Sequence, residues 1–237
     1  MTGGEATLHD PVAPAGSGTS RCEVIVLSSL HQLHERVPGY GYAELARVVE
    51  CLRPDVLALE LSPEDLAARM PQSIKREYQF SVYPLLDRLG SVCLPLEPPQ
   101  HNPMIDRARA ARRLFHPDTH PSAALFATYV EHLFAWLLEN WLSPADVNSA
   151  QTDALLAVKH RFQEAIAPAE EAASWEEWNQ HFLARILEAA HAHPGQRVVA
   201  IVGVEHAYWL RQRLRLHPGL ALLDTELLLR TECENQP

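Results

Sequence analysis

The sequence predicts an α/β protein with a mostly parallel central sheet flanked by helices, and three observations lead to this prediction. Short β-branched apolar runs recur along the chain, helical periodicity fills the segments between them, and a long helical stretch precedes the last such run. Alternating strands and helices are typical of parallel sheets, because each parallel connection needs a crossover. We expect one α/β domain over residues 22–237, with a helical insertion at about 104–192.

Three strands are expected in the first half of the chain. The runs "EVIVLSS" (23–29), "DVLALEL" (55–61) and "SVCLPLE" (91–97) are short, apolar and bounded by polar or turn residues. The first two are separated by "YAELARVVECL", whose apolar residues have helical spacing and which Pro54 ends. The sequence therefore predicts a β–α–β unit at its start.

Two more helices are expected between the second and third strands. Ser62 is a good cap and Pro63 suits a first helical turn, so a helix is predicted to begin there. Residues 73–89 predict another helix, with a kink at Pro84 and an end at Gly90. These helices complete a second crossover.

The second half of the chain predicts helices first and a strand afterwards. Residues 122–142, "QTDALLAVKHRFQEAI" and "SWEEWNQHFLARILEAAHAH" read as three helices. Then "QRVVAIVGV" (196–204) predicts a strand, residues 205–217 a helix, and "LALLDTELLL" a final strand or helix. An aromatic stripe in the helical part is interpreted as packing. Its members are Phe126, Tyr129, Phe134, Trp136 and Trp141.

Composition restricts the partners. The formal net charge of −10 disfavours nucleic acid and anionic membrane surfaces. The apolar runs fall short of the roughly 20 residues that span a bilayer. Residues 1–21, rich in Gly, Pro, Ser and Thr, predict a disordered tail without a secretory signal. Four cysteines without a C-x-x-C pair then predict reduced thiols and a cytoplasmic location.

Polar side chains stand where the predicted strands end. His31 follows the first strand, Glu60 lies near the end of the second, and His206 follows the late strand. Glu97 and Glu205 occupy similar places. Because parallel α/β sheets bind ligands at the carboxyl ends of their strands, these groups are expected at one edge.

A set of two histidines and a carboxylate suits two kinds of chemistry. His31, Glu60 and His206 could hold a catalytic divalent metal ion (zinc, manganese or cobalt) with an open coordination position. They equally suit metal-free acid–base work by a histidine and a carboxylate. A third reading is structural, with these groups only stabilising the sheet edge. Phosphate-binding loops, dinucleotide fingerprints and G-x-S-x-G motifs do not occur in the sequence.

The same residues resemble the TraB/Tiki superfamily. That family carries two G-x-x-H motifs and, between them, a strand of the type "RPDVVAVEL"; the corresponding stretches here are "SSLH" (28–31), "GVEH" (203–206) and "RPDVLALELSPEDLAAR" (53–69). Ser28 stands where the family has glycine. The family includes Tiki-type metal-dependent proteases, pheromone-shutdown TraB/PrgY proteins, haem-binding ChaN-like proteins and erythromycin esterases that use a histidine base. The resemblance covers the α/β core.

The leading hypothesis is a metal-dependent, peptidase-like hydrolase in which His31, Glu60 and His206 hold the metal ion or act as base. Arg69, Glu97 and Glu205 would orient the substrate or support the ligands, and a small molecule or peptide would be the substrate. One alternative is a metal-independent esterase with His31 or His206 as base. Another is a protein that binds haem or a different small molecule without catalysis. A homo-oligomer is left open.

Overall fold

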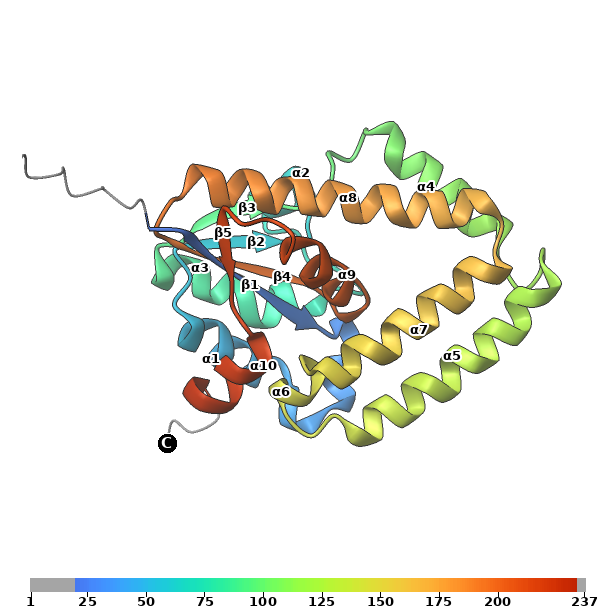
Figure 1. The fold of residues 1–237 in the computed structure, drawn as a ribbon, viewed down its shortest axis with the longest axis horizontal. Coiled ribbons are helices and arrows are strands. Elements are labelled where there is room, and N and C mark those ends of the chain that lie inside the picture. Colours follow the sequence, from blue (N-terminus) through green and yellow to red (C-terminus); the bar gives the residue numbers. More distant parts are fainter. Residues whose placement is uncertain (1–19, 234–237) are drawn as a thin grey trace, which may run out of the picture.

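A five-stranded, fully parallel sheet forms the centre of the computed structural model, which describes residues 20–233 (Figure 1). The strands are β1 (Cys22–Ser29), β2 (Val56–Leu59), β3 (Val92–Pro95), β4 (Arg197–Gly203) and β5 (Leu220–Leu222). Their spatial order is β3-β2-β4-β1-β5. The predicted α/β class with a parallel sheet is confirmed.

The register brings the two histidine-bearing segments together. β4 pairs with β1 along the whole length of β4, from Arg197 opposite Glu23 to Gly203 opposite Ser29. β2 pairs with the other edge of β4. The inner residues of β1, β2 and β4 are completely buried, as near-continuous apolar strands of a parallel sheet must be. The chain segments that leave β1 and β4 therefore start at the same height on the sheet.

Helices cover the sheet on opposite sides (Figure 1). The helices α8 (Ala169–Ala192) and α9 (Val204–Leu214) pack on β1 and β4. The helices α1 (Tyr42–Leu52) and α3 (Tyr83–Leu89) lie together on the opposite side. Shorter elements complete the described part. They are the 3₁₀ helices η1 (His31–Arg36) and η2 (Pro38–Tyr40), α2 (Pro63–Ala68), α10 (Thr225–Leu228), and the π-helices η3 (Tyr78–Val82) and η4 (Leu229–Cys233).

Five helices occupy the stretch between β3 and β4. They are α4 (Pro103–Leu114), α5 (Pro121–Asn140), α6 (Pro144–Val147), α7 (Ala150–Ile166) and α8. Proline opens three of them, where its missing N–H is harmless and its fixed φ favours the helix. In Figure 1, α5 and α7 extend beyond the sheet, whereas α8 runs back across it.

Local signals place several helix ends. Ser62 accepts a hydrogen bond from the amide of Asp65, so the predicted cap of α2 is confirmed. The helix predicted over residues 73–89 begins later and is irregular. Tyr83 donates its amide to the Tyr78 carbonyl, five residues back, just before Pro84. Proline lacks an amide and its ring clashes with the carbonyl four residues earlier, which favours such a wider turn.

The prediction of reduced thiols is wrong for one cysteine pair. Cys51 on α1 forms a disulfide with Cys233 in η4, with Cα atoms 5.7 Å apart. Nothing in the spacing indicates the pair, because 182 residues separate the two positions. Cys22 and Cys93 are free. The cytoplasmic location loses the support of reduced thiols, since disulfides persist mainly in oxidising compartments.

Two further expectations concern the ends of the chain and membranes. Most of the tail predicted at residues 1–21 falls at positions 1–19, outside the described residues. Within residues 20–233, every helix is too short or too polar to cross a bilayer.

Candidate active site

His31 lies directly after β1 and is held by a buried carboxylate. It takes the left-handed backbone conformation, with a φ of 52°, which turns the chain sharply into η1. Its Nδ1 lies 2.7 Å from Glu77 Oε1, and its Nε2 lies 3.8 Å from Glu60 Oε1. Since a carboxylate accepts hydrogen bonds, Nδ1 carries the proton and Nε2 is left as the basic nitrogen.

Sequence reasoning missed Glu77. This residue precedes η3, is completely buried, and accepts a second hydrogen bond of 2.6 Å from the Ser29 hydroxyl at the end of β1. The only signal was an acidic residue beside the apolar positions of a predicted helix. Charged residues are rarely buried without a partner. Through these two contacts Glu77 holds the Ser29 hydroxyl and the His31 ring in place.

Burial lowers the pKa of His31, but the hydrogen bond to Glu77 and the charges of Glu60 and Glu77 outweigh that effect. The net result is a pKa raised above the ordinary 6.5. An imidazolium is therefore stabilised at this position. That property suits a group that must accept a proton during a reaction.

Glu60 is the second buried carboxylate. Its Oε2 accepts a 2.6 Å hydrogen bond from the amide of Gly203, and its Oε1 lies 3.0 Å from Lys75 Nζ. Burial raises the pKa of Glu60, but the Lys75 ammonium and the neighbouring histidines lower it further, to about 2. Glu60 thus stays ionised, and the apolar run around it does not turn it toward solvent.

Lys75 joins two of the predicted carboxylates. It also donates to the Glu60 carbonyl oxygen at 2.9 Å and forms an ion pair with Glu97. Burial lowers the pKa of Lys75, but Glu60 and Glu97 raise it above its ordinary value, so the ammonium stays charged. Glu97 therefore supports Glu60 indirectly, through a lysine that the sequence analysis did not single out.

His206 is fixed by the helix α8. The Asn179 amide donates to the Trp175 carbonyl at 2.8 Å, which orients its oxygen toward His206 Nδ1, 2.9 Å away. His206 must therefore carry its proton on Nδ1 and present a bare Nε2. Burial lowers the pKa of His206 to about 4, although Glu60 and Glu205 act in the opposite direction. His206 is neutral at pH 7.

One cavity connects the two predicted histidines. It measures about 210 Å³, and His31, Gly203 and His206 all line it. Gly203 is required there, because a Cβ at this position would lie 2.8 Å from His31 Nε2. The first turn of α9 also faces the cavity, and its amides have no partner within the helix. Such amides stabilise negative charge.

Ser28 has a different task from its neighbour Ser29. Alternation along β1 sends the two side chains to opposite faces. The Ser28 hydroxyl accepts a 3.1 Å hydrogen bond from Arg211, a buried residue of α9 that also contacts Asn148 and Asp153. Ser28 thus belongs to a structural network away from His31.

Glu205 also borders the cavity, but its carboxylate is paired with a lysine of α7. Its carboxylate pairs with the buried Lys159 of α7 at 3.0 Å, and this charge lowers the pKa of Glu205 well below its usual range against the opposing effect of burial. His160 lies 3.6 Å from the same oxygen. Glu205 therefore links α9 to α7. Its carboxylate pairs with Lys159 and not with the first-turn amides of α9.

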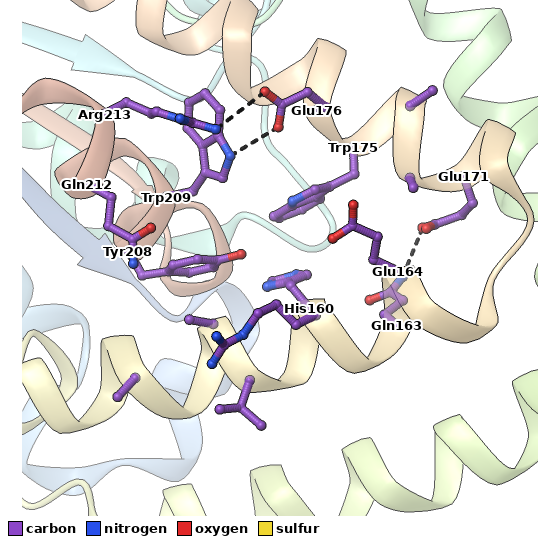
Figure 2. A pocket seen from close by; sticks show the side chains of 16 residues that line it. His160, Gln163, Glu164, Glu171, Trp175, Glu176, Tyr208, Trp209, Gln212 and Arg213 are labelled. Carbon is purple, nitrogen blue, oxygen red and sulfur yellow. Dashed lines mark hydrogen bonds and ion pairs between the residues drawn. The ribbon is translucent and has the colours of Figure 1, made fainter. Parts of the chain in front are cut away.

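A stack of rings separates the active-site cavity from a larger one. His206 stacks on Trp175, Trp175 on His160, and His160 on Tyr208, with ring centroids 4.6, 4.1 and 5.3 Å apart. Beyond the stack lies a cavity of about 710 Å³ between α7, α8 and α9. Figure 2 shows Glu164 and the Tyr208 hydroxyl pointing into it. The helical part of the chain thus encloses His206.

Arg69 lies outside this arrangement. It ends α2 in the left-handed conformation and pairs with the exposed Asp87 at 2.6 Å. It is absent from the lining of the 210 Å³ cavity. The structure therefore brings His31, Glu60 and His206 to one sheet edge, links Glu97 to them through Lys75, and leaves Arg69 apart.

The residues fit a resident metal ion poorly. Within residues 20–233, no group of three histidine, cysteine, aspartate or glutamate side chains is arranged to hold one. The Lys75 ammonium stands beside Glu60 Oε1, where a cation would bind that carboxylate. A haem fits no better, since the cavity is smaller than the about 300–1,000 Å³ of pockets for drug-sized ligands.

Comparison of the chain with protein-family models, with curated proteins and with solved structures finds no match.

Proposed function

We propose that this protein is a metal-independent hydrolase of esters, with His31 as the general base. The observation that supports it is the Glu77–His31 hydrogen bond of 2.7 Å, made by a histidine that lines a cavity. A carboxylate behind a histidine fixes its tautomer and ring orientation and stabilises the imidazolium formed in the reaction. The raised pKa of His31 fits that role.

Water is the nucleophile in this proposal. The Ser29 hydroxyl lines the cavity but donates its proton to Glu77 at 2.6 Å, so it is committed to holding the carboxylate. His31 Nε2 accepts a proton from water as the water oxygen attacks the ester carbonyl. The resulting imidazolium then protonates the departing alkoxide when the carbon–oxygen bond breaks. The products are a carboxylic acid and an alcohol, and His31 returns to its neutral form.

The remaining groups of the site stabilise charge or orient the reactants. The first-turn amides of α9 stabilise the oxyanion of the tetrahedral intermediate. Glu60, 3.8 Å from His31 Nε2, stabilises the imidazolium, and Lys75 keeps Glu60 ionised. His206, neutral at pH 7, presents Nε2 as an acceptor for the attacking water or the leaving alcohol.

Ester hydrolysis by the purified chain, with and without a strong chelator, tests the proposal. Activity is expected to survive chelation, and His31→Ala is expected to lower kcat by at least about a hundredfold, the usual contribution of general acid–base catalysis. Loss of activity on chelation, with recovery on adding zinc or manganese, would instead support the metal-dependent peptidase hypothesis. Undiminished turnover by His31→Ala would remove His31 as base.

A further inference from the structure

Besides the reacting histidines, the lining of the active-site cavity combines several apolar side chains with Ser29, Gln32 and Glu205. Leu30 and Leu33 come from the turn after β1, Ile74 from the segment before η3, and Phe134 from α5. Phe134 is held in place by an edge-to-face contact with Trp141, with ring centroids 6.2 Å apart. A member of the aromatic stripe thus forms a wall beside His31.

The charges around the cavity disfavour an anionic ligand. Among residues 20–233, no lysine or arginine belongs to its lining. Two lysines that pair with carboxylates of this region are Lys75, with Glu60 and Glu97, and Lys159, with Glu205. The carboxylates of Glu60 and Glu77 lie next to His31. A carboxylate or phosphate on the acyl chain would lie near these carboxylates, and no lysine or arginine of residues 20–233 lines the cavity to pair with it.

The size of the cavity limits the length of the bound group. Its volume of about 210 Å³ corresponds to roughly seven water molecules at about 30 Å³ each. An ester carbonyl with its two oxygens takes about three of these atomic positions, which leaves room for roughly three or four more carbon atoms.

We infer that the cavity binds the neutral, aliphatic acyl group of small esters, of about four carbons, and that Phe134 sets the limit on chain length. This inference rests on the proposed esterase function and adds its substrate class. Each methylene that enters an apolar cavity is expected to raise kcat/KM by about fourfold until the cavity is full.

The test compares kcat/KM for p-nitrophenyl acetate, butyrate, hexanoate and octanoate. The wild-type chain is expected to prefer butyrate, and Phe134→Ala to move the optimum to hexanoate or octanoate. Mono-p-nitrophenyl succinate, which carries an added carboxylate, is expected to react at least tenfold more slowly than the butyrate. Trp136→Ala, an aromatic truncation on the same helix, is the matched control and should keep the wild-type order. Phe134→Leu replaces Phe134→Ala if the latter fails to fold.

A binding measurement separates the two proposals. Saturation-transfer NMR with 2-pentanone, 2-heptanone and 2-nonanone reports chain-length preference without turnover. If the ketones follow the predicted order and no ester is hydrolysed, the cavity assignment stands and the esterase function fails. If esters are hydrolysed without chain-length preference, or if Phe134→Ala leaves the order unchanged, the inference about the acyl group is overturned.

Discussion

At the scale of single residues, the candidate site depends on contacts that leave little free space. Gly203 ends β4 and donates its amide to Glu60, while its missing side chain leaves room for the His31 ring. The glycine of the "GVEH" motif thus has a steric explanation, independent of any family resemblance.

Gly203→Ala tests that explanation. The added methyl would lie 2.8 Å from His31 Nε2, so the His31 ring must move, whereas Glu60 Oε2 at 3.4 Å is close to an ordinary contact. We expect ester turnover to fall at least about tenfold. The free energy of unfolding should fall by only about 1–3 kcal/mol, the usual range for overpacking. Gly219→Ala is the control, because a Cβ there meets nothing within 4 Å. Equal activities of the two variants would contradict the steric role.

Glu77→Gln tests the positioning of His31. The amide keeps the shape of the side chain but removes the charge that helps raise the pKa of His31. The rate–pH profile rises as His31 loses its proton, so its midpoint is expected to move to lower pH, with kcat reduced and KM nearly unchanged. Glu35→Gln, an exposed carboxylate paired with Arg76, is the control. An unshifted midpoint would show that Glu77 has only a structural role.

His206 makes stability depend on pH in a definite direction. Its pKa is about 4 in the folded chain and about 6.5 in an unfolded one, so the unfolded state binds more protons between these values. The contribution of neutral His206 to the free energy of unfolding is therefore present above pH 6.5 and is lost as the pH falls toward 4. Denaturant unfolding at pH 7 and pH 5 should show a smaller loss for His206→Gln than for the wild-type chain. An identical loss would contradict the pKa assignment.

At the scale of elements, α9 links the helix α7 to the central sheet. Arg211 donates to Asp153 of α7 at 2.6 Å and to the Val26 carbonyl of β1 at 2.7 Å, and it is buried in doing so. Lys159 and Glu205 provide a second link between α7 and α9. These buried links fix α9, and with it the turn that carries Gly203 and His206.

Arg211→Met is expected to cost about 2–3 kcal/mol of unfolding free energy, because the partly buried Asp153 loses its counter-ion. Gln212→Met, an exposed position within the same helix, should change stability by only about 0.5 kcal/mol. Asp153→Asn should lower the free energy of unfolding less in the Arg211→Met background than in the wild-type chain. Strict additivity in chemical denaturation would contradict a direct pair.

The site residues that could be predicted from the sequence are those that the topology of the parallel sheet places. Strand ends of a parallel sheet share one edge, so the positions of His31, Glu60 and His206 follow from their places after apolar runs. Glu77, Lys75 and Asn179 were missed because irregular turns and helix packing bring them there, and neither leaves a periodic signal.

At the scale of the whole molecule, the helices between β3 and β4 build part of the site. Asn179 and Trp175 of α8 hold His206, and Phe134 of α5 lines the cavity. The helical pattern of this stretch was predictable from its periodicity. Its contribution to the site was not, because the aromatic stripe reads as packing until the fold shows which ring faces His31.

The disulfide restrains the molecule on a similarly large scale. Linking Cys51 to Cys233 across 182 residues is expected to contribute up to about 5 kcal/mol by restricting the unfolded chain. Cys51→Ala together with Cys233→Ala should lower the denaturant midpoint, and a reductant should lower it for the wild-type chain but not for this double variant. Cys93→Ala keeps the disulfide and is the control. A wild-type midpoint insensitive to reductant would contradict this contribution.

The place of β4 in the sheet has a consequence for synthesis on the ribosome. β4 lies between β1 and β2, yet it is translated after both of them and after the five helices that follow β3. Until residues 197–203 emerge, β1 and β2 present unpaired edges that can join those of other nascent chains. A ribosome that stalls before β4 therefore releases an aggregation-prone fragment rather than a smaller folded protein, and prompt completion of the chain protects it.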